Sequence, residues 1–589
     1  MAALFTTPKR NDKTSGAHFV EPDVRRRTLL AHGSWRRVTR RIVVGAVCAL
    51  TVSSLLMPSV SLAAEWVDVG GTQYYAATGD EAGTWSWDGA DDMKLNGYDG
   101  GTIKAAGKLN LSYGGDNTVT NNNGRGILVE DGANENAELN IQGGASDTLN
   151  VTSSSDAIIS IGDINIDGAG TVNATSTGFD AIDAKGDLTI KGSGNVNATG
   201  DSDGIRAGGN ITIDNSGTVT AKAFEEKGIQ ANENLTVKGG GKVEASSNED
   251  VAIWADGNID ISGGSQVEAS SQGDLAVDAE GSLAVANASL DASGVEYGVY
   301  GSKGITLDHA TVTVRATTGG GWQTIALITD EDDIVIKNGS IVDALAEGGF
   351  SAAIASRNYN PGESGGHIYI SDSAVKAIAR YIETGGGGPD HYSNDQDGET
   401  IPERRGLNIG IFAQTSEGIT PATISIIRSK VTAEGDTAAI FALAMSADGK
   451  AIGTIEIEGA TILTPKGGKV IDYRNKEELS DGVVYEAGQT IGTGDATIDS
   501  PYDAAVAKST LIAPPEETRP EEKPGETKPK GSKSEGTKTT KTVAVAATGA
   551  KATGKLAATG DASSAAIVAA ALAGTAAIAA GALASRKRS

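Results

Sequence analysis

The chain has 589 residues, of which 79 are glycine and only 4% are aromatic. It is too long for one ordinary compact domain, because a single hydrophobic core stops growing at about 250–300 residues. Lys and Arg number 49 against 76 Asp and Glu, which gives a formal net charge of −27. This charge excludes nucleic-acid binding by counterion release and fits a soluble, exported surface.

The first 63 residues have the order of a secretory signal peptide. Arginines between Arg25 and Arg41 precede the apolar run Ile42–Met57, and Pro58 and small residues follow. We predict cleavage after Ala63, with Ala64 as the neighbouring choice; the alternative is an uncleaved anchor helix, for which the run is short. Removing residues 1–63 changes the formal charge from −27 to −34 and removes the sole cysteine, Cys48. The mature chain then has no disulfide, cysteine nucleophile or thiolate metal site.

The segment from Gly162 to Lys303 is an internal repeat with a period of about 24 residues. Each repeat holds three short runs in which apolar and polar residues alternate, separated by Gly, Asn, Asp or Ser. Such alternation is typical of strands with one buried face. The six repeats begin at Gly162, Gly186, Gly209, Asn234, Gly257 and Gly281.

Three strands per repeat bury their apolar faces only when successive repeats stack. We therefore predict an all-β fold, a right-handed parallel β-helix with one repeat per coil. The alternative is a β-sandwich of short hairpins, which needs no strict three-run period. Small residues expected to face the narrow interior are Ala174, Ala198, Ala221, Ala245 and Ala269.

The β-helix is expected to span residues 100–481, between two different ends. Residues 64–99 are unlike the repeats and rich in aromatic residues, so we interpret them as an N-terminal cap; the alternative is a sugar-stacking site. Residues 482–513 form a C-terminal cap or transition. The stretch 385–405 lacks any apolar period and is predicted to be a projecting loop, either a tolerated insertion or a functional loop. The aromatic residues of the cap are Trp66, Tyr74, Tyr75, Trp85, Trp87 and Tyr98.

The remaining residues predict a stalk and a membrane anchor. Residues 514–555 combine Pro, Glu, Lys, Thr and Gly, so they form an extended, disordered stalk without a core. Residues 556–589 begin with Leu-Ala-Ala-Thr-Gly, continue with an apolar run at 562–584 and end in Arg586, Lys587 and Arg588. The apolar run makes a helix of roughly 34 Å, long enough to span a bilayer, and the basic cluster stays cytoplasmic.

This C-terminal arrangement resembles the cell-wall sorting signal of Gram-positive surface proteins, in its Leu-Ala-x-Thr-Gly variant. The resemblance implies that a sortase recognises Leu556, Ala557, Ala558, Thr559 and Gly560, cuts after Thr559 and joins it to the cell envelope. The membrane helix then anchors the protein only before processing. The alternatives are a retained C-terminal membrane anchor and a glycolipid anchor, against which the basic terminus argues.

The repeats, with their -LTI-xGxGxVxA-xxxDGIxA- pattern between about Leu95 and Val314, resemble a β-helical carbohydrate-binding domain family of bacterial surfaces. The resemblance implies an acidic polysaccharide ligand and bound calcium.

One outward column differs from the others. The outward residues of the first and second strands form polar ladders that solvate their sheets. Those of the third strand mix aromatic, cationic and acidic groups, so we predict carbohydrate binding there. Scattered exposed aromatic residues without a role are the alternative. This third-strand column comprises Asp183, Arg206, Gln230, Trp254, Asp278 and Tyr300.

A second column is acidic and lies just before the third strand. Its carboxylates, one coil apart at about 4.8 Å, repel one another, and Ca²⁺ is the hard, oxygen-ligated cation suited to neutralise them. The alternative is that Asp serves only as a turn residue. The column comprises Asp156, Asp180, Asp203, Glu226, Asp250, Asp274 and Glu296.

Together these features predict an exported protein anchored to the cell wall of a Gram-positive bacterium, with a rod that binds a polysaccharide or acts as an adhesin. A polysaccharide lyase or hydrolase is the enzymatic alternative. We expect no enzyme, because only Arg206 supplies an arginine to the six repeats and no catalytic cluster stands out among the five histidines. A structural adhesin that contacts host protein is the third reading.

Overall fold

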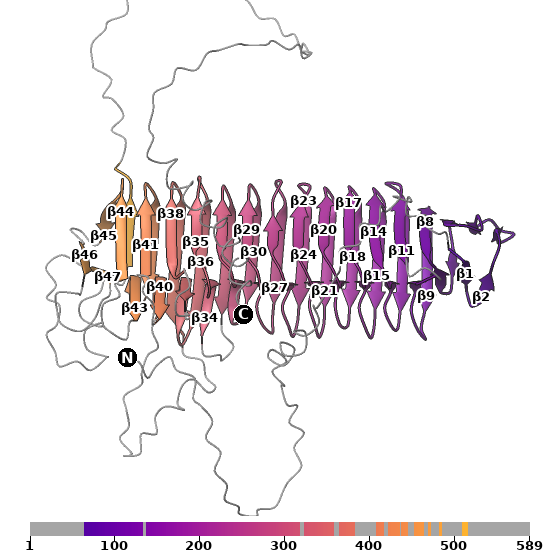
Figure 1. The fold of residues 1–589 in the computed structure, drawn as a ribbon, viewed down its shortest axis with the longest axis horizontal. Helices are drawn as coiled ribbons and strands as arrows, with labels where there is room; N and C mark the ends of the chain where they lie inside the picture. Colours follow the sequence, from indigo (N-terminus) through magenta and orange to yellow (C-terminus); the bar gives the residue numbers. More distant parts are fainter. Residues whose placement is uncertain are drawn as a thin grey trace, which may run out of the picture. The chain divides into compact units, whose positions relative to one another are not determined.

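The computed structural model describes residues 64–132, 137–317, 323–358, 365–382, 408–416, 422–435, 438–445, 453–464, 469–472, 482–485 and 509–515. All of them belong to one compact unit, Met1–Glu517. Their secondary structure consists of β-strands, without a helix among the described residues. The strands follow one another in groups of three, and each group makes one coil that contributes one strand to each of three sheets. The predicted all-β parallel β-helix is thus confirmed, and Figure 1 shows its coils side by side in sequence order.

The first sheet collects the first strand of each coil. Its strands pair in parallel from β5 onward, and β3 and β4 join the end of the sheet antiparallel. In order, its 16 strands are β3 (Thr78–Gly79), β4 (Trp85–Trp87), β5 (Asp92–Asn96), β8 (Lys108–Gly114), β11 (Glu138–Gly143), β14 (Asp163–Gly168), β17 (Leu188–Gly192), β20 (Ile211–Asn215), β23 (Leu235–Lys238), β26 (Ile259–Ile261), β29 (Leu283–Ala286), β32 (Ile305–Asp308), β35 (Ile334–Lys337), β38 (His367–Ser371), β41 (Ala422–Ile427) and β44 (Gly453–Glu458).

The second sheet collects the second strands and ends with an inserted antiparallel strand, β48, between β42 and β45. In order, its 15 strands are β6 (Asp99–Gly100), β9 (Asp116–Asn121), β12 (Thr148–Ser153), β15 (Thr171–Ser176), β18 (Asn195–Gly200), β21 (Thr218–Ala223), β24 (Lys242–Ser247), β27 (Gln266–Ser271), β30 (Ser289–Gly294), β33 (Thr311–Thr317), β36 (Ile341–Gly348), β39 (Ala374–Tyr381), β42 (Lys430–Gly435), β48 (Ser509–Ala513) and β45 (Thr461–Thr464).

The third sheet collects the third strands, with antiparallel strands at both ends. In the order of their pairings, its strands are β2 (Thr72–Tyr74), β1 (Trp66–Val69), β7 (Ile103–Ala106), β10 (Ile127–Glu130), β13 (Ile158–Ser160), β16 (Ile182–Ala184), β19 (Ile205–Ala207), β22 (Ile229–Ala231), β25 (Ile253–Ala255), β28 (Val277–Ala279), β31 (Tyr297–Gly301), β34 (Thr324–Thr329), β37 (Ser351–Asn358), β40 (Asn408–Ser416), β43 (Ala438–Met445), β47 (Gly482–Tyr485) and β46 (Lys469–Asp472).

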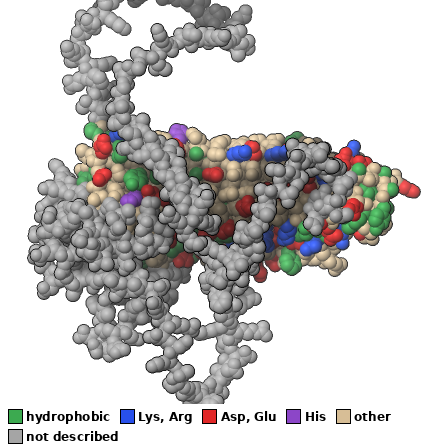
Figure 2. Space-filling view, in the orientation of Figure 1, with side chains coloured by type: hydrophobic (Ala, Val, Ile, Leu, Met, Phe, Trp, Pro, Cys, Tyr) green, Lys and Arg blue, Asp and Glu red, His purple; other side chains and the backbone are tan. Residues whose placement is uncertain are grey.

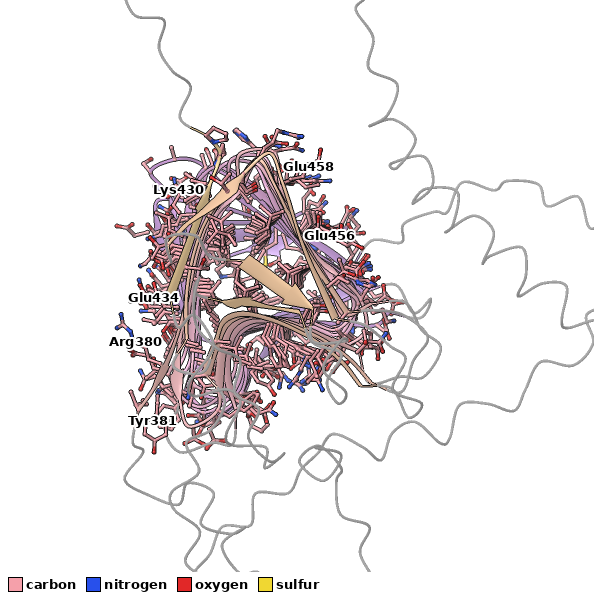
Figure 3. All side chains as sticks on the ribbon, turned by 90° about the vertical axis from the view of Figure 1, so that its left-hand side faces the viewer. Arg380, Tyr381, Lys430, Glu434, Glu456 and Glu458 are labelled. Carbon is pink, nitrogen blue, oxygen red and sulfur yellow. The ribbon has the colours of Figure 1, made fainter. Side chains whose placement is uncertain are left out.

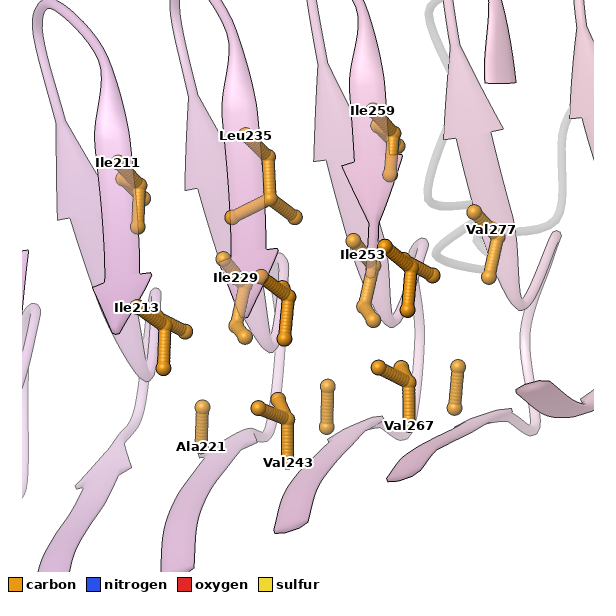
Figure 4. Packing of buried hydrophobic residues seen from close by; sticks show 14 of the residues in the cluster. Ile211, Ile213, Ala221, Ile229, Leu235, Val243, Ile253, Ile259, Val267 and Val277 are labelled. Carbon is orange, nitrogen blue, oxygen red and sulfur yellow. The ribbon is translucent and has the colours of Figure 1, made fainter. Parts of the chain in front are cut away.

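The core is a continuous apolar column enclosed by the three sheets. Inward residues stack on equivalent residues of the next coil, for example Ile229 on Ile253 and Val243 on Val267 (Figure 4). The five alanines expected to face the interior are all buried. Viewed along the column, the sheets form three sides, and charged residues such as Lys430 and Glu456 lie on the outside (Figure 3). Because each coil touches only its neighbours, this core lengthens without widening.

Side-chain ladders help to fix the turn from the third sheet to the first. The backbone N–H of Asp187 donates to Asp163 Oδ1 (2.8 Å), and the backbone N–H of Asn210 donates to Asp187 Oδ1 (2.7 Å). The pattern continues where Asn258 N donates to Asn234 Oδ1 (2.9 Å). An Asp or Asn at the start of each of the first five repeats therefore accepts a hydrogen bond from a backbone N–H of the next coil.

The turn from the first sheet to the second contains a left-handed residue in most coils. Early coils use glycine: Gly192 has φ 105°, and a Cβ there would lie 2.3 Å from the carbonyl oxygen of Gly168. Later coils place Asn287, His309 and Asn338 at positive φ instead. Asn tolerates this conformation better than most residues, so Asn287 can replace glycine at this position.

Most of the aromatic residues of the N-terminal segment pack inward. Trp85 and Trp87 of β4 are buried, Trp87 Nε1 donates to the carbonyl oxygen of Ala90 (2.8 Å), and Tyr74 packs on Trp85 with ring centroids 5.4 Å apart. Tyr75 is the exposed exception, at 71%. Strand β5, at the end of this segment, already pairs in parallel with β8 of the following coil.

Candidate functional site: the outward column of the third sheet

The third-strand column lies in direct register on the outer side of the third sheet. Its six residues are carried by β16, β19, β22, β25, β28 and β31, and each is the cross-strand partner of the next. Because parallel strands lie about 4.8 Å apart, Trp254 and Tyr300 are separated by roughly 9.6 Å. The structure therefore brings together all six residues singled out from the sequence.

Their exposure differs along the column. Arg206, Gln230, Trp254, Asp278 and Tyr300 are half-buried, whereas Asp183 is only 1% exposed. Asp183 Oδ2 accepts a hydrogen bond from Lys185 Nζ, and Asp183 Oδ1 is buried without a hydrogen-bond partner. Burial raises the pKa of Asp183, against the opposing effect of Lys185.

A lysine lies beside the tryptophan. Lys227 Nζ is 5.9 Å from the centroid of the Trp254 ring and donates to Asp250 Oδ2 (2.8 Å). Burial lowers the pKa of Lys227, but the hydrogen bond to Asp250 and nearby acids overcome this effect, so the pKa is raised. The ammonium group is therefore charged at neutral pH and adds a cation to this part of the column.

The end of the column holds a pair of tyrosines. The rings of Tyr297 and Tyr300 stack with centroids 6.2 Å apart at 25°. Gln323 Oε1 lies 3.4 Å from the Tyr297 hydroxyl and accepts from Arg357 Nη1 at 2.7 Å, and Arg357 Nε donates to Asp330 Oδ1 at 2.8 Å. Burial raises the pKa of Tyr300 to about 12. Tyr297 was not predicted from the sequence, because it lies before the third-strand positions that were compared between coils.

The seven acids of the predicted metal column lie in two adjacent columns. Ile205, Ile229 and Ile253 occupy equivalent positions in successive coils. Asp203 and Lys227 each lie two residues before the isoleucine of their coil. Glu226 and Asp250 lie three residues before it. Asp156, Asp180 and Asp203 are buried, Asp250 and Asp274 are half-buried, and Glu226 and Glu296 are exposed. A residue's place in the turn therefore decides whether its carboxylate faces the core or the solvent.

Basic residues of the chain already lie against these acids. Arg125 Nε pairs with Asp156 Oδ2 (2.9 Å), Arg206 Nη1 lies 3.6 Å from Asp180 Oδ2, and Lys227 pairs with Asp250. Figure 2 shows acidic and basic side chains interspersed on the face turned to the viewer. Much of the repulsion expected from the sequence is thus relieved within the protein.

Three carboxylates nevertheless converge. Asp156, Asp180 and Asp183 each offer an oxygen, and these oxygens lie within 4.8 Å of one another; the described residues hold no other such group of His, Cys, Asp or Glu. The unpartnered Asp183 Oδ1 fits a hard cation, although each of the three acids also has a basic residue beside it: Arg125, Arg206 and Lys185. Sequence reasoning missed Asp183 as a member, because it counted Asp183 in the other column.

Two acidic residues, Asp203 and Asp278, have strongly raised pKa values. Burial raises the pKa of Asp203 to about 7, and the charge of Asp180 adds to the rise. Burial likewise raises the pKa of Asp278 to about 7, with contributions from Glu280 and Asp274. Asp278 Oδ1 has no hydrogen-bond partner. Each of these two carboxyl groups, one in each column, is therefore only partly ionised at neutral pH.

Comparisons with protein-family models, with curated proteins and with solved structures found no match to this chain. Within the described ranges there is also no helix long and apolar enough to cross a membrane. The predicted signal peptide 1–63, loop 385–405, stalk 514–555, sorting motif 556–560 and membrane span 562–584 all lie wholly or mainly outside the described residues.

Proposed function

We propose that this chain is an exported surface protein, anchored to the envelope of a Gram-positive bacterium, whose right-handed β-helix binds a polysaccharide through the third-sheet column. One observation carries the proposal: a single register places a half-exposed tryptophan, a tyrosine, an arginine and carboxylates along one face. The right-handed winding follows from the strong preference of parallel crossover connections for that hand.

The column offers the three kinds of contact that an acidic sugar polymer needs. The Trp254 and Tyr300 rings supply apolar faces two coils apart, about the length of two sugar units. Arg206, whose side chain is 36% exposed, supplies a guanidinium group that can donate two hydrogen bonds to a carboxylate. Asp278 and Gln230 supply hydrogen-bond groups for hydroxyls.

A glycan array tests this proposal with wild type and two variants. Trp254→Ala removes an apolar face and is expected to weaken binding to acidic glycans about tenfold or more while leaving the melting temperature nearly unchanged. Tyr75→Ala, an exposed aromatic residue of the terminal segment, is the matched control and retains binding. Equal binding by wild type and Trp254→Ala contradicts the proposed site.

An activity assay and the array together separate the other two hypotheses. A purified protein that releases reducing or unsaturated sugars from an acidic polysaccharide is a lyase or hydrolase. Binding to host protein with no glycan bound on the array indicates an adhesin of another specificity.

We further propose that Ca²⁺ binds at the acidic edge, with Asp156, Asp180 and Asp183 as the best-placed ligands, since their oxygens converge. Bound Ca²⁺ supplies positive charge that also attracts an acidic sugar. Thermal melts with millimolar Ca²⁺ and with chelator test this, because a ligand of the folded state raises the midpoint. An unchanged midpoint leaves the acids as turn residues and ion-pair partners.

The proposed anchoring rests on the C-terminal motif. Replacing Thr559 by Ala is expected to move the protein from the cell-wall fraction to the membrane or the medium. An unchanged wall fraction contradicts sortase processing.

A further inference from the structure

The outer face of the second sheet is uncharged across three neighbouring coils. In β12, β15 and β18 every residue that alternates with the buried ones is Thr or Asn. The central positions are Asn, and the flanking positions are Thr except for Asn195. We call these outward residues the Thr/Asn face. Its central column consists of Asn150, Asn173 and Asn197.

The central amides are held in a fixed orientation. Asn173 Nδ2 donates to Asn150 Oδ1 and Asn197 Nδ2 donates to Asn173 Oδ1, both at 2.8 Å. Each amide has a second N–H and a second lone pair that this ladder does not use. The face thus presents pre-oriented donors and acceptors, which reduces the ordering entropy lost on binding.

The lack of charge is local to these coils and is not a property of the sheet. The same positions in the following strands β24, β27 and β30 include Lys242, Glu244, Glu268 and Asp291. Strand propensity explains threonine but not asparagine, which is depleted in strands. In a chain that is 21% charged, three neighbouring coils thus share an uncharged, partly exposed outer face.

We propose that the Thr/Asn face binds a neutral polysaccharide laid along the coils, with one sugar residue per coil. A neutral ligand fits this face because no charge has to be desolvated on either side. The side-by-side donor and acceptor of an amide match neighbouring hydroxyls on a sugar ring, and the spacing of about 4.8 Å between coils is close to the length of one sugar residue. This site is separate from the third-sheet column and does not depend on it.

The test uses lysine substitutions at positions that tolerate lysine. Thr175 and Thr199 lie in the same column as Lys222, so the double variant Thr175→Lys/Thr199→Lys keeps the coil geometry while adding charge to the face. Ser270→Lys lies in that column two coils beyond Lys222, in the charged region, and is the matched control. Co-sedimentation of the purified protein with insoluble cellulose and with chitin gives the affinity, and the melting temperature reports folding.

We expect wild type and Ser270→Lys to sediment equally with at least one of the two polymers. The double variant is expected to bind about tenfold or more weakly, because its ammonium groups lose hydration against a neutral surface, at an unchanged melting temperature. Trp254→Ala is expected to retain this binding, which separates the inference from the proposed function.

Three results overturn the inference. Wild type does not sediment with either polymer, or the double variant binds as tightly as wild type. Alternatively, wild type is a dimer in solution and the double variant a monomer, in which case the face joins two copies of this chain.

Discussion

The outward column of the third sheet changes character along the chain, and two neighbouring stretches of it are opposite. From β16 to β31 it is polar or aromatic and, after Asp183, half-exposed. In the next coils the same register continues through Ile328, Ala355, Phe412 and Phe441, and all four are buried. The inward column does not change at this border, since Val299, Leu327 and Ile354 stack directly. The core that joins the coils is therefore independent of the chemistry that the outer face presents.

This border is visible in the strands themselves. Strands β34 and β37 are buried at every residue, whereas β19 and β22 alternate. Strands covered on both faces are expected to carry near-continuous apolar runs. The first region thus has one face free to meet a ligand, and the second is covered on both faces.

The largest expected difference between the regions is in stability. Phe412 is 1% exposed and stacks on Phe441 with centroids 5.7 Å apart, so Phe412→Ala should lower the free energy of unfolding by about 3 kcal/mol or more. Phe224→Ala, at a position 52% exposed, should change it by less than about 0.5 kcal/mol. Denaturant melts measure both. Similar values for the two variants mean that the outer column of the second region is not buried.

A smaller effect concerns pH and the first region. Burial raises the pKa of Asp278 to about 7, whereas an unfolded Asp ionises near 4. Its contribution to stability is present below pH 4 and is lost as the pH rises through about 7. Wild type should therefore lose up to about 3 kcal/mol more than Asp278→Asn between pH 4 and pH 8.

The control for this comparison is Asp260→Asn, an exposed position of the first sheet, which should follow the wild-type pH dependence. If the free energy of unfolding has the same pH dependence in wild type and Asp278→Asn, burial does not raise the pKa of Asp278.

The smallest effect compares two lysines. Lys227 is 17% exposed, pairs with Asp250 and lies beside Trp254, so Lys227→Met should cost about 1 kcal/mol. Lys191 pairs with Asp167 at 3.3 Å, with both side chains about half exposed, and Lys191→Met should cost about 0 to 0.5 kcal/mol. A thermal melt of each variant resolves the difference. A larger loss for Lys191→Met contradicts the greater stabilisation expected from the less exposed Lys227–Asp250 pair.

The fold was predictable because each repeat carries the same three alternating runs. The same alignment of the repeats also predicted that Arg206, Gln230 and Trp254 are neighbours in register. The buried outer column was predictable in principle from the loss of alternation in Thr324–Thr329. The place of Lys227 among the acids was not, because it depends on a one-residue shift within a turn. Nor was the convergence of Asp183 with Asp156 and Asp180, which joins residues from two columns.

Thiol labelling tests the two-region column most directly. In a chain whose sole cysteine, Cys48, is replaced by Ser, we compare Gln230→Cys with Ala355→Cys, one from each region of the column. The folded Gln230→Cys protein should react with a soluble thiol reagent as an accessible thiol, whereas Ala355→Cys should react only after denaturant is added. Rapid labelling of both folded variants would contradict the account, because the second region would then be as open as the first.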